Sequence, residues 1–320
     1  MASIAPQTLR VLGWNIENYG PKKDLAGGAE LIKFIAEVIR YRNFDIAAIC
    51  EVRQNWADKI GLKLKAELAG AWDYFASEQY VPGRLEQYLF LWNGATVTRQ
   101  NIAGTKAGFQ DKFFDGKKAQ VGFSRFIKDR PPLMGQFEAK ASKGKLRVAM
   151  YHAPEPKDWR DPRDAAINMA TATDLRPAGM ASVVMGDFNV KKSANWQNGN
   201  YGQFCFAKLV GEGFTQQLSK NELTSLTKRN TVITSLADCK CQPYDQIFTW
   251  TPGAPATAVP TRVEDLIDEA MKTAKVSAPL LALLKKLAKN TTKIGTYQDA
   301  FSAYRRLVSD HLPVSAEIAV

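Results

Sequence analysis

Short runs of apolar and β-branched residues recur along the chain, each bounded by polar or turn-forming residues. Runs of this length and composition are typical of buried or half-buried β-strands. They predict strands at residues 9–14, 46–50, 88–92, 146–151, 182–185, 246–250 and 313–318.

Between these runs, apolar residues repeat at the spacing of one helix face. The pattern predicts helices at residues 29–41, 55–68 and 163–174. Predicted helices and strands alternate along the chain, which indicates the α/β class.

One stretch departs from this alternation. Residues 251–259 are rich in proline, alanine and threonine, and residues 262–290 show the pattern of two amphipathic helices, the second at 279–290. We therefore expect a single domain over residues 1–320 with a helical insertion at about 254–293. The simpler interpretation is that the insertion packs on the parent domain. The alternative is a lid or a basic contact surface, because the second helix carries Lys285, Lys286 and Lys289, whereas the acidic residues of the stretch lie in the first.

Composition and charge narrow the class of protein. With 45% hydrophobic and 23% charged residues in 320, the chain has ample material for a core, which excludes disordered and collagen-like proteins. No apolar run approaches the ~20 residues of a membrane span, and residues 1–10 lack the pattern of a secretory signal. We expect a cytoplasmic location by default, with delivery or export by another route left open. The net charge of +11 suits a polyanion such as nucleic acid, or an anionic membrane surface.

The four cysteines are too few for a disulfide scaffold in a chain of this length. Cys239 and Cys241 lack the CxxC spacing of a zinc or redox site, and no second pair completes a zinc site. Reduced structural thiols are the favoured interpretation. A disulfide between Cys205 and one of that pair remains an alternative.

Polar residues of one kind stand at the ends of the predicted strands. Asn15, Glu51, Asp187, Asn189 and Asp310 form an oxygen-rich set without cysteine. Because ligands of α/β proteins gather beyond strand ends, and because oxygen donors suit hard cations, this set predicts a site for Mg²⁺, with Mn²⁺ or Ca²⁺ as alternatives, rather than for zinc. Each residue alone fits a turn or a cap. The combination is more informative, because the only two histidines of the chain fall in the same segments.

The order of these segments resembles the endonuclease/exonuclease/phosphatase superfamily. The matching motifs are WNIENY, ICEVR, EQYLFLW, YHAP, MGDFN, YDQIF and SDHLPV, which span residues 14–314. Three of them, EVR, EQYLF and YDQI, resemble the deoxyribonuclease I branch. The Trp-Cys-Asp-Arg motif of inositol phosphatases is absent, and Arg53 stands where sphingomyelinases usually have Phe. The resemblance implies a four-layered α/β sandwich, in which two packed, mainly antiparallel sheets are flanked by helices.

The resemblance also implies roles for the oxygen-rich set. Glu51, with Asn15 and Asp310, is expected to hold the divalent cation, and Asp187 is expected beside it at the scissile phosphate. Asn189 is expected to contact the phosphate or the attacking water. The number of metal ions stays open.

The same resemblance places His152 and His311 on either side of the phosphate. It implies that Glu86 orients His152, that Asp245 orients His311, and that Arg53 reaches toward the nucleic-acid groove. A carboxylate behind each imidazole would fix its tautomer and raise its basicity. Which imidazole is the base and which the acid stays open.

We therefore expect a metal-dependent phosphodiesterase that acts on nucleic acid, most simply a DNA endonuclease of low sequence specificity, without a stable protein partner. One alternative keeps the site but changes the substrate to a phospholipid or phosphoinositide. A second alternative is a binding module with a catalytically inactive site. This alternative is disfavoured because none of the expected metal ligands and neither histidine is missing. Lys285, Lys286 and Lys289 are expected to add contacts to the phosphate backbone.

Overall fold

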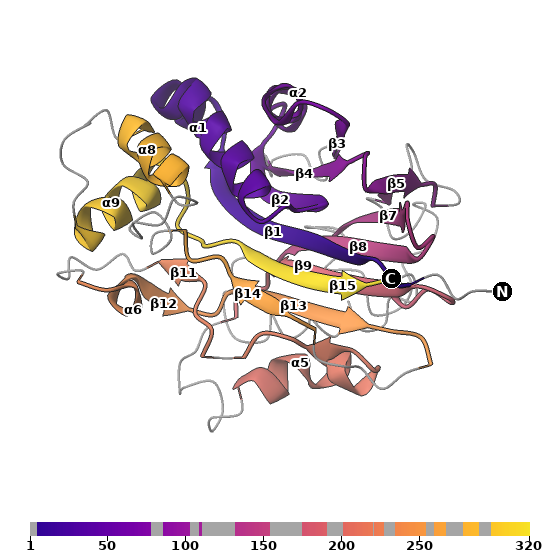
Figure 1. Ribbon diagram of the computed structural model, residues 1–320. Helices are drawn as coiled ribbons and strands as arrows, with labels where there is room; N and C mark the ends of the chain where they lie inside the picture. The colour runs from indigo at the N-terminus through magenta and orange to yellow at the C-terminus, as the bar shows by residue number, and fades with distance from the viewer. Residues whose placement is uncertain are drawn as a thin grey trace.

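The computed structural model describes residues 5–77, 86–102, 109–110, 132–153, 175–190, 201–219, 221–226, 234–253, 259–266, 278–287 and 296–320. Within these ranges, two large β-sheets lie face to face, and helices cover their outer sides (Figure 1).

The first sheet has six strands. Their order is β14 (Thr261–Val263), β15 (Val314–Ala319), β1 (Thr8–Tyr19), β2 (Ile46–Arg53), β4 (Glu86–Asn93) and β3 (Trp72–Ala76). The pair β1–β2 is parallel, and the other neighbours are antiparallel.

The second sheet has seven strands, again mainly antiparallel, with β8–β9 as its parallel pair. Its order is β10 (Thr215–Gln216), β13 (Asp245–Trp250), β9 (Ala181–Asp187), β8 (Lys145–His152), β7 (Leu133–Ala139) and β5 (Val97–Gln100), with β6 (Phe109–Gln110) also paired to β7. A separate two-stranded sheet pairs β11 (Ser225–Leu226) with β12 (Lys240–Gln242).

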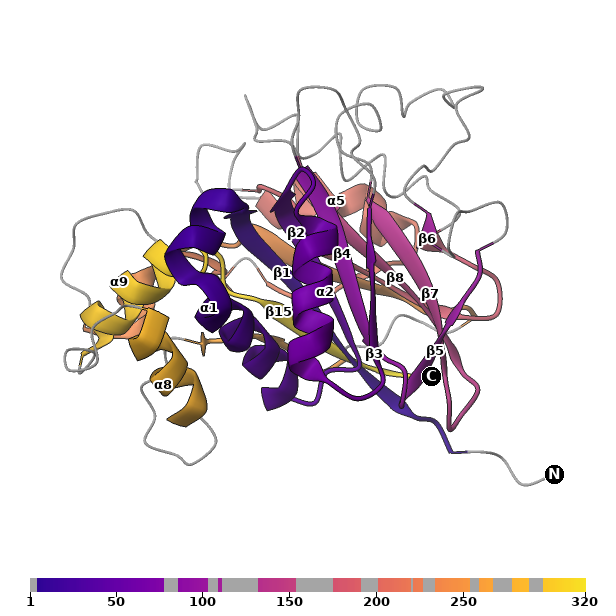
Figure 2. The ribbon, with the colours of Figure 1, turned by 90° about the horizontal axis from the view of Figure 1, so that it is seen from above.

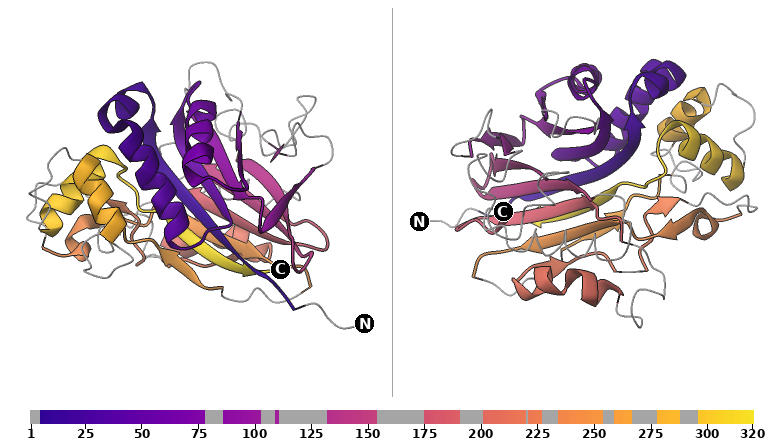
Figure 3. Two further views of the ribbon diagram at one scale, coloured as in Figure 1. Left: turned by 45° about the horizontal axis from the view of Figure 1, so that its top comes forward. Right: turned by 180° about the vertical axis from the view of Figure 1, so that it is seen from behind.

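Helices form the outer layers. The first sheet is covered by α1 (Pro21–Tyr41) and α2 (Ala57–Leu68), and α8 (Ala278–Leu287) and α9 (Tyr297–Leu307) pack beside α1 (Figure 2). On the opposite side, α5 (Tyr201–Gly211) covers the second sheet (Figure 3), and the short α6 (Leu236–Cys239) lies beside β12. This arrangement confirms the predicted four-layered α/β sandwich.

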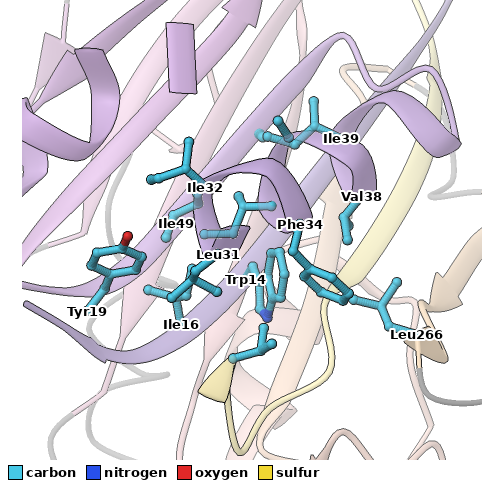
Figure 4. Packing of buried hydrophobic residues seen from close by; sticks show 14 of the residues in the cluster. Trp14, Ile16, Tyr19, Leu31, Ile32, Phe34, Val38, Ile39, Ile49 and Leu266 are labelled. Carbon is cyan, nitrogen blue, oxygen red and sulfur yellow. The ribbon is translucent and has the colours of Figure 1, made fainter. Parts of the chain in front are cut away.

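The alternation along β1 shows how the layers are held together. Val11 faces the core between the two sheets, whereas Leu12 and Trp14 face the helices. Successive strand residues point to opposite faces of a sheet, so β1 contributes side chains to two cores. On the helix side, Trp14 packs beneath α1, whose Leu31 and Phe34 point toward the sheet (Figure 4). A third core lies between the second sheet and α5.

Two predicted helices have different beginnings in the structure. Helix α1 begins at Pro21 rather than at residue 29, with a non-helical kink at Gly28, where φ is 52°. The apolar repeat starts only after this kink, so the sequence showed the second part alone. Helix α2 begins at Ala57 rather than at residue 55. The predicted helix at 163–174 lies outside the described residues.

Part of the predicted insertion is a strand, so the predicted start of its first helix at residue 262 is wrong. Thr261–Val263 form β14, which pairs with β15 at the edge of the first sheet. The carboxylate of Glu264, only 3% exposed, accepts from Ser315 Oγ at 2.6 Å and pairs with Arg42 at 3.3 Å. Long-range pairing with β15 therefore overrides the local helical pattern. The second predicted helix is confirmed as α8, and residues 254–258, 267–277 and 288–293 lie outside the described ranges.

The remaining expectations concern thiols and membranes. Cys50, Cys239 and Cys241 are free thiols, so neither Cys239 nor Cys241 forms the disulfide that the sequence left open. None of the helices among the described residues combines the length and the apolarity that crossing a membrane requires.

Candidate active site

The two parallel strand pairs deliver polar side chains to one end of the sandwich. The carboxyl ends of β1, β2, β8 and β9 carry Asn15, Glu51, His152 and Asp187. In the register of the second sheet, Asp187 lies beside His152 on β8 and Asp245 on β13. Strand β9 requires glycine just before Asp187, because Gly186 has φ 134° and a Cβ there would lie 2.0 Å from the carbonyl oxygen of Tyr151.

Asp187 lies at the centre of the site. Its Oδ2 accepts a hydrogen bond from Asn15 Nδ2 at 3.0 Å and lies 3.8 Å from His152 Nε2 and 3.6 Å from His311 Nε2. The same Asn15 amide donates to Glu51 Oε1 at 2.8 Å. Two carboxylates and two imidazoles, contributed by both sheets, therefore meet within one small volume.

His311 is held by its ring and by its backbone. Its Nδ1 lies 2.7 Å from Asp245 Oδ2, which leaves Nε2 turned toward Asp187. The backbone carbonyl of His311 accepts from Tyr304 Oη at 2.9 Å and from Trp14 Nε1 at 3.4 Å. Buried aromatic side chains of the helix-side core thus fix the position of this imidazole.

His152 has a matching arrangement on the second sheet. Its Nδ1 lies 3.0 Å from Glu86 Oε2, and its Nε2 lies 3.3 Å from Glu51 Oε1. The backbone N–H of His152 donates to the hydroxyl of Tyr88 at 3.0 Å. The predicted pairs Glu86–His152 and Asp245–His311 are therefore both within hydrogen-bond distance.

Burial and neighbouring charges shift the pKa values of Asp187 and His311. Burial raises the pKa of Asp187 to about 6, with the neighbouring Asp245 adding to the rise and His311 opposing it. Burial lowers the pKa of His311, but the carboxylates of Asp245 and Asp187 outweigh it and raise this pKa well above the ordinary value of 6.5. The metal-free site therefore favours an imidazolium at His311.

The donor set fits a hard cation. Ligand atoms of Glu51, His152 and Asp187 all lie within 4.8 Å of one another. The two carboxylates suit Mg²⁺ or Mn²⁺, which bind through a few protein oxygens and complete their shell with water and phosphate. A cation bound there would neutralise phosphate charge and activate water.

Two predicted metal ligands have other partners in the structure. Asn15 turns its Nδ2 toward Glu51 and Asp187, while its Oδ1 accepts from the backbone N–H of Glu17 at 2.9 Å. Asn15 thus holds the two carboxylates together. Asp310 lies at the edge of the site, with Oδ1 3.8 Å from His311 Nε2 and Oδ2 3.6 Å from Arg305 Nη2.

Asn189 lies next to the central carboxylate. Its backbone N–H donates to Asp187 Oδ1 at 2.7 Å, and its Nδ2 donates to the carbonyl oxygen of Ala153 at 2.8 Å. The residue has φ 54°, which turns the chain sharply after β9. Its predicted contact with phosphate or water stays a prediction.

Arg53 lies beside the site, opposite Glu86 in the β2–β4 register. A bulge in β2 precedes it, because Glu51 has φ 58° and the register shifts between Ile49 and Val52. Arg53 is exposed and lies over Gly20, where a Cβ would be 2.7 Å from Arg53 Cγ.

Two of the three lysines that are predicted to contact the phosphate backbone belong to the described residues. Helix α8 buries Leu280 and Leu284 in the helix-side core, with Lys285 half-buried and Lys286 exposed. Lys289 lies outside the described residues.

Other side chains support the site without having been predicted. Asn18 donates from its backbone N–H and from Nδ2 to Glu51 Oε2, at 3.2 and 3.1 Å. Ser309 Oγ donates to the carbonyl oxygen of Asn15 at 2.7 Å and accepts from the backbone N–H of His311 at 3.0 Å. Both residues belong to the motifs WNIENY and SDHLPV, which marks them as candidates in the sequence. Only the structure shows which hydrogen-bond partner each of them has.

Comparison with known proteins agrees with this architecture. Residues 12–311 match the model of the endonuclease/exonuclease/phosphatase family. None of the curated proteins matches the chain by sequence.

Several solved structures share the fold. An endonuclease/exonuclease/phosphatase family protein from Bacteroides thetaiotaomicron is similar over 99% of this chain and 96% of its own, at 16% identity and a TM-score of 0.56. D. rerio TDP2 in complex with a single-strand DNA product is similar over 97% and 98%, at 13% identity and a TM-score of 0.56. A mannosyl-6-phosphatase from B. thetaiotaomicron is similar over 98% and 99%, at 15% identity and a TM-score of 0.54. At these identities the similarity shows the fold alone. Proteins that share a fold can act on different substrates.

Proposed function

The chain belongs to the endonuclease/exonuclease/phosphatase family, whose members are metal-dependent phosphoesterases, and from that premise we propose that it is a phosphodiesterase that cuts DNA with little sequence preference. The observation that carries the proposal is the convergence of two imidazoles on Asp187, each with a carboxylate behind its other nitrogen.

The paired imidazoles suit an in-line displacement at phosphorus. His152, with Nδ1 directed at Glu86, takes the proton of the attacking water through Nε2 as the new phosphorus–oxygen bond forms. His311 donates its Nε2 proton to the leaving oxygen as the second phosphorus–oxygen bond breaks. Asp245 stabilises the imidazolium from which that proton departs. Glu51 and Asp187 would hold a divalent cation, which would supply charge neutralisation on the phosphate.

The surroundings of the site support a polyanionic substrate. The chain carries a net charge of +11, and exposed Arg53 lies across the strand pair from Glu86. Neutralisation of backbone phosphates by such side chains gives affinity without sequence readout. The solved structure of TDP2 with a single-strand DNA product shows that this fold accommodates nucleic acid.

The test uses the purified chain and supercoiled plasmid with Mg²⁺, Mn²⁺, Ca²⁺ or EDTA. We expect nicking that requires a divalent cation and that falls at least ~10²-fold in His311→Ala. Parallel reactions contain linear DNA, RNA, phosphatidylinositol phosphate vesicles and mannose 6-phosphate. Release of phosphate from the lipid or the sugar, with intact plasmid, would overturn the proposal in favour of another substrate class.

A further inference from the structure

A half-buried lysine on α1, with its side chain 13% exposed, lies beside the candidate active site. Lys23 Nζ donates to the backbone carbonyl oxygens of Ile16 at 2.9 Å, Glu17 at 2.7 Å and Val308 at 2.7 Å. An ammonium group has three N–H donors, and these three carbonyls use them all. The Glu17 carboxylate lies 3.8 Å away. Although burial lowers the pKa of Lys23 to about 8, the ammonium form prevails at neutral pH.

Two of the carbonyls belong to an irregular part of β1. The β1–β2 register shifts between Asn15 and Tyr19, and Glu17 and Asn18 have φ values of 46° and 54°. Side chains with a Cβ disfavour this left-handed region, so the backbone conformation persists only where its surroundings hold it. Lys23 supplies two hydrogen bonds to this bulge, from within the first turns of the helix that follows.

The bulge arranges the acidic side of the site. It places the backbone N–H of Glu17 against Asn15 Oδ1, and it brings both donors of Asn18 to Glu51 Oε2. Asn15 in turn joins Glu51 to Asp187. A change in the bulge would therefore move the carboxylates.

The third carbonyl belongs to the segment that carries the histidine. Val308 immediately precedes Ser309, which bonds both the Asn15 carbonyl oxygen and the His311 backbone N–H. Lys23 thus connects the bulge of β1 to the segment before β15, directly next to the Ser309 contact.

We propose that Lys23 is a positioning residue, whose ammonium joins the β1 bulge to the segment before β15 and so sets the Glu51 and Asp187 carboxylates against His311. This rests on the proposed function, since its main measure is phosphodiester turnover. Lys23 touches none of the reacting atoms and acts through backbone oxygens.

The neighbouring Lys22 provides the control. It lies on the same helix and is exposed. In plasmid nicking, Lys23→Met should lower kcat by about tenfold or more, because misplacement of catalytic groups by a fraction of an ångström is costly, while KM for DNA stays near the wild-type value. Lys22→Met should change neither quantity. A wild-type kcat in Lys23→Met would overturn the proposal.

Chemical rescue separates positioning from general support of the fold. Propylammonium chloride should restore part of the kcat of Lys23→Ala, since it returns an ammonium to the three carbonyl oxygens, and it should not affect His311→Ala. Circular dichroism monitors folding in each case. A folded variant without rescue, or one that stays unfolded with the amine present, would overturn the proposal.

A second measurement does not depend on activity. In the metal-free protein, the imidazole NMR resonances of His152 and His311 should shift in Lys23→Met and stay unchanged in Lys22→Met. If the wild-type chain cuts no phosphodiester with any metal, the proposed function fails, and these resonances alone decide the role of Lys23. Unshifted imidazoles in Lys23→Met would overturn that role.

Discussion

The Nδ1 atom of His311 lies 2.7 Å from Oδ2 of Asp245, and both side chains are buried. The other ring nitrogen lies 3.6 Å from Asp187 Oδ2, so carboxylates lie near both nitrogens. Burial alone would lower the pKa of the imidazole. The two carboxylates outweigh burial and raise this pKa well above 6.5, and the imidazolium is therefore the stable form at neutral pH.

This relationship predicts a titration in the metal-free protein. His311 should keep its proton as the pH rises past its ordinary pKa of 6.5, and Asp245→Asn should make it titrate at lower pH, because a neutral amide no longer stabilises the charge. With only two histidines in the chain, NMR resolves each imidazole. Glu86→Gln serves as the control, since it should act on the His152 resonance. A wild-type His311 that titrates at or below 6.5 would contradict the assignment.

Replacement of either histidine tests the roles in catalysis. His152→Ala and His311→Ala should each lower turnover at least ~10²-fold, because each removes a proton-transfer group from the transition state. Folding and DNA affinity should largely remain, and circular dichroism and a binding assay at fixed salt concentration measure them. An unaltered rate in either variant would show that the imidazole at that position takes no part in the chemistry.

Much of the fold and of the candidate site could be predicted because the sequence pattern that indicates them is local. Asn15, Glu51 and Asp187 stand where an apolar run gives way to polar residues, which marks the ends of the predicted strands. With two histidines in 320 residues, few other residues could act as the imidazoles of the site. The structure brings these side chains together, with Glu86 and Asp245 behind the imidazoles.

The parts that could not be predicted depend on long-range contacts. Strand β14 forms because Thr261–Val263 pair with β15, although the sequence pattern predicted a helix from residue 262. The bulge at Glu51 depends on the pairing of β2 with β4, where the register shifts between Ile49 and Val52, and it has no local signal in the sequence. The contacts of Lys23 join α1 to Val308, 285 positions away, so no window of sequence could show them.

The metal ligands have distinguishable contributions. Asp187→Ala and Glu51→Ala should each abolish metal-dependent cleavage. Excess Mg²⁺ should restore activity in Glu51→Ala more readily, because Glu51 lies near one imidazole, whereas Asp187 lies within 4 Å of both and is lost to both in Asp187→Ala. Initial rates over a Mg²⁺ series measure the difference. Equal rescue of the two variants would contradict the central role of Asp187.

Arg53 is expected to contact duplex DNA. Arg53→Ala should weaken cutting of duplex DNA and spare hydrolysis of a small phosphodiester such as bis(p-nitrophenyl) phosphate, because only the polymer extends beyond the site. Lys145→Gln is the matched loss of charge, since Lys145 is exposed at the opposite end of β8 from His152. Equal loss on both substrates would mean that Arg53, which covers Gly20, supports the shape of the site instead.

The basic end of the insertion gives the last prediction. In α8, Leu280 and Leu284 are buried against the helix-side core, whereas Lys286 is exposed and Lys285 half-buried. We propose that these lysines, with Lys289, contact the phosphate backbone and supply affinity without base contacts.

Replacing Lys285, Lys286 and Lys289 with Gln should weaken DNA binding and reduce the slope of log K against log salt by roughly one for each phosphate that the variant leaves without a neutralising lysine. Turnover at saturating DNA should change little, because the residues of the site lie on β1, β2, β4, β8, β9, β13 and the segment before β15. The matched control replaces Lys140, Lys143 and Lys145, which are exposed at the β7–β8 turn, at the opposite end of β8 from His152. That variant removes the same charge, so an equal fall in its salt slope would trace the effect to net charge. A slope in the α8 variant identical to that of the wild type would show that α8 serves packing alone.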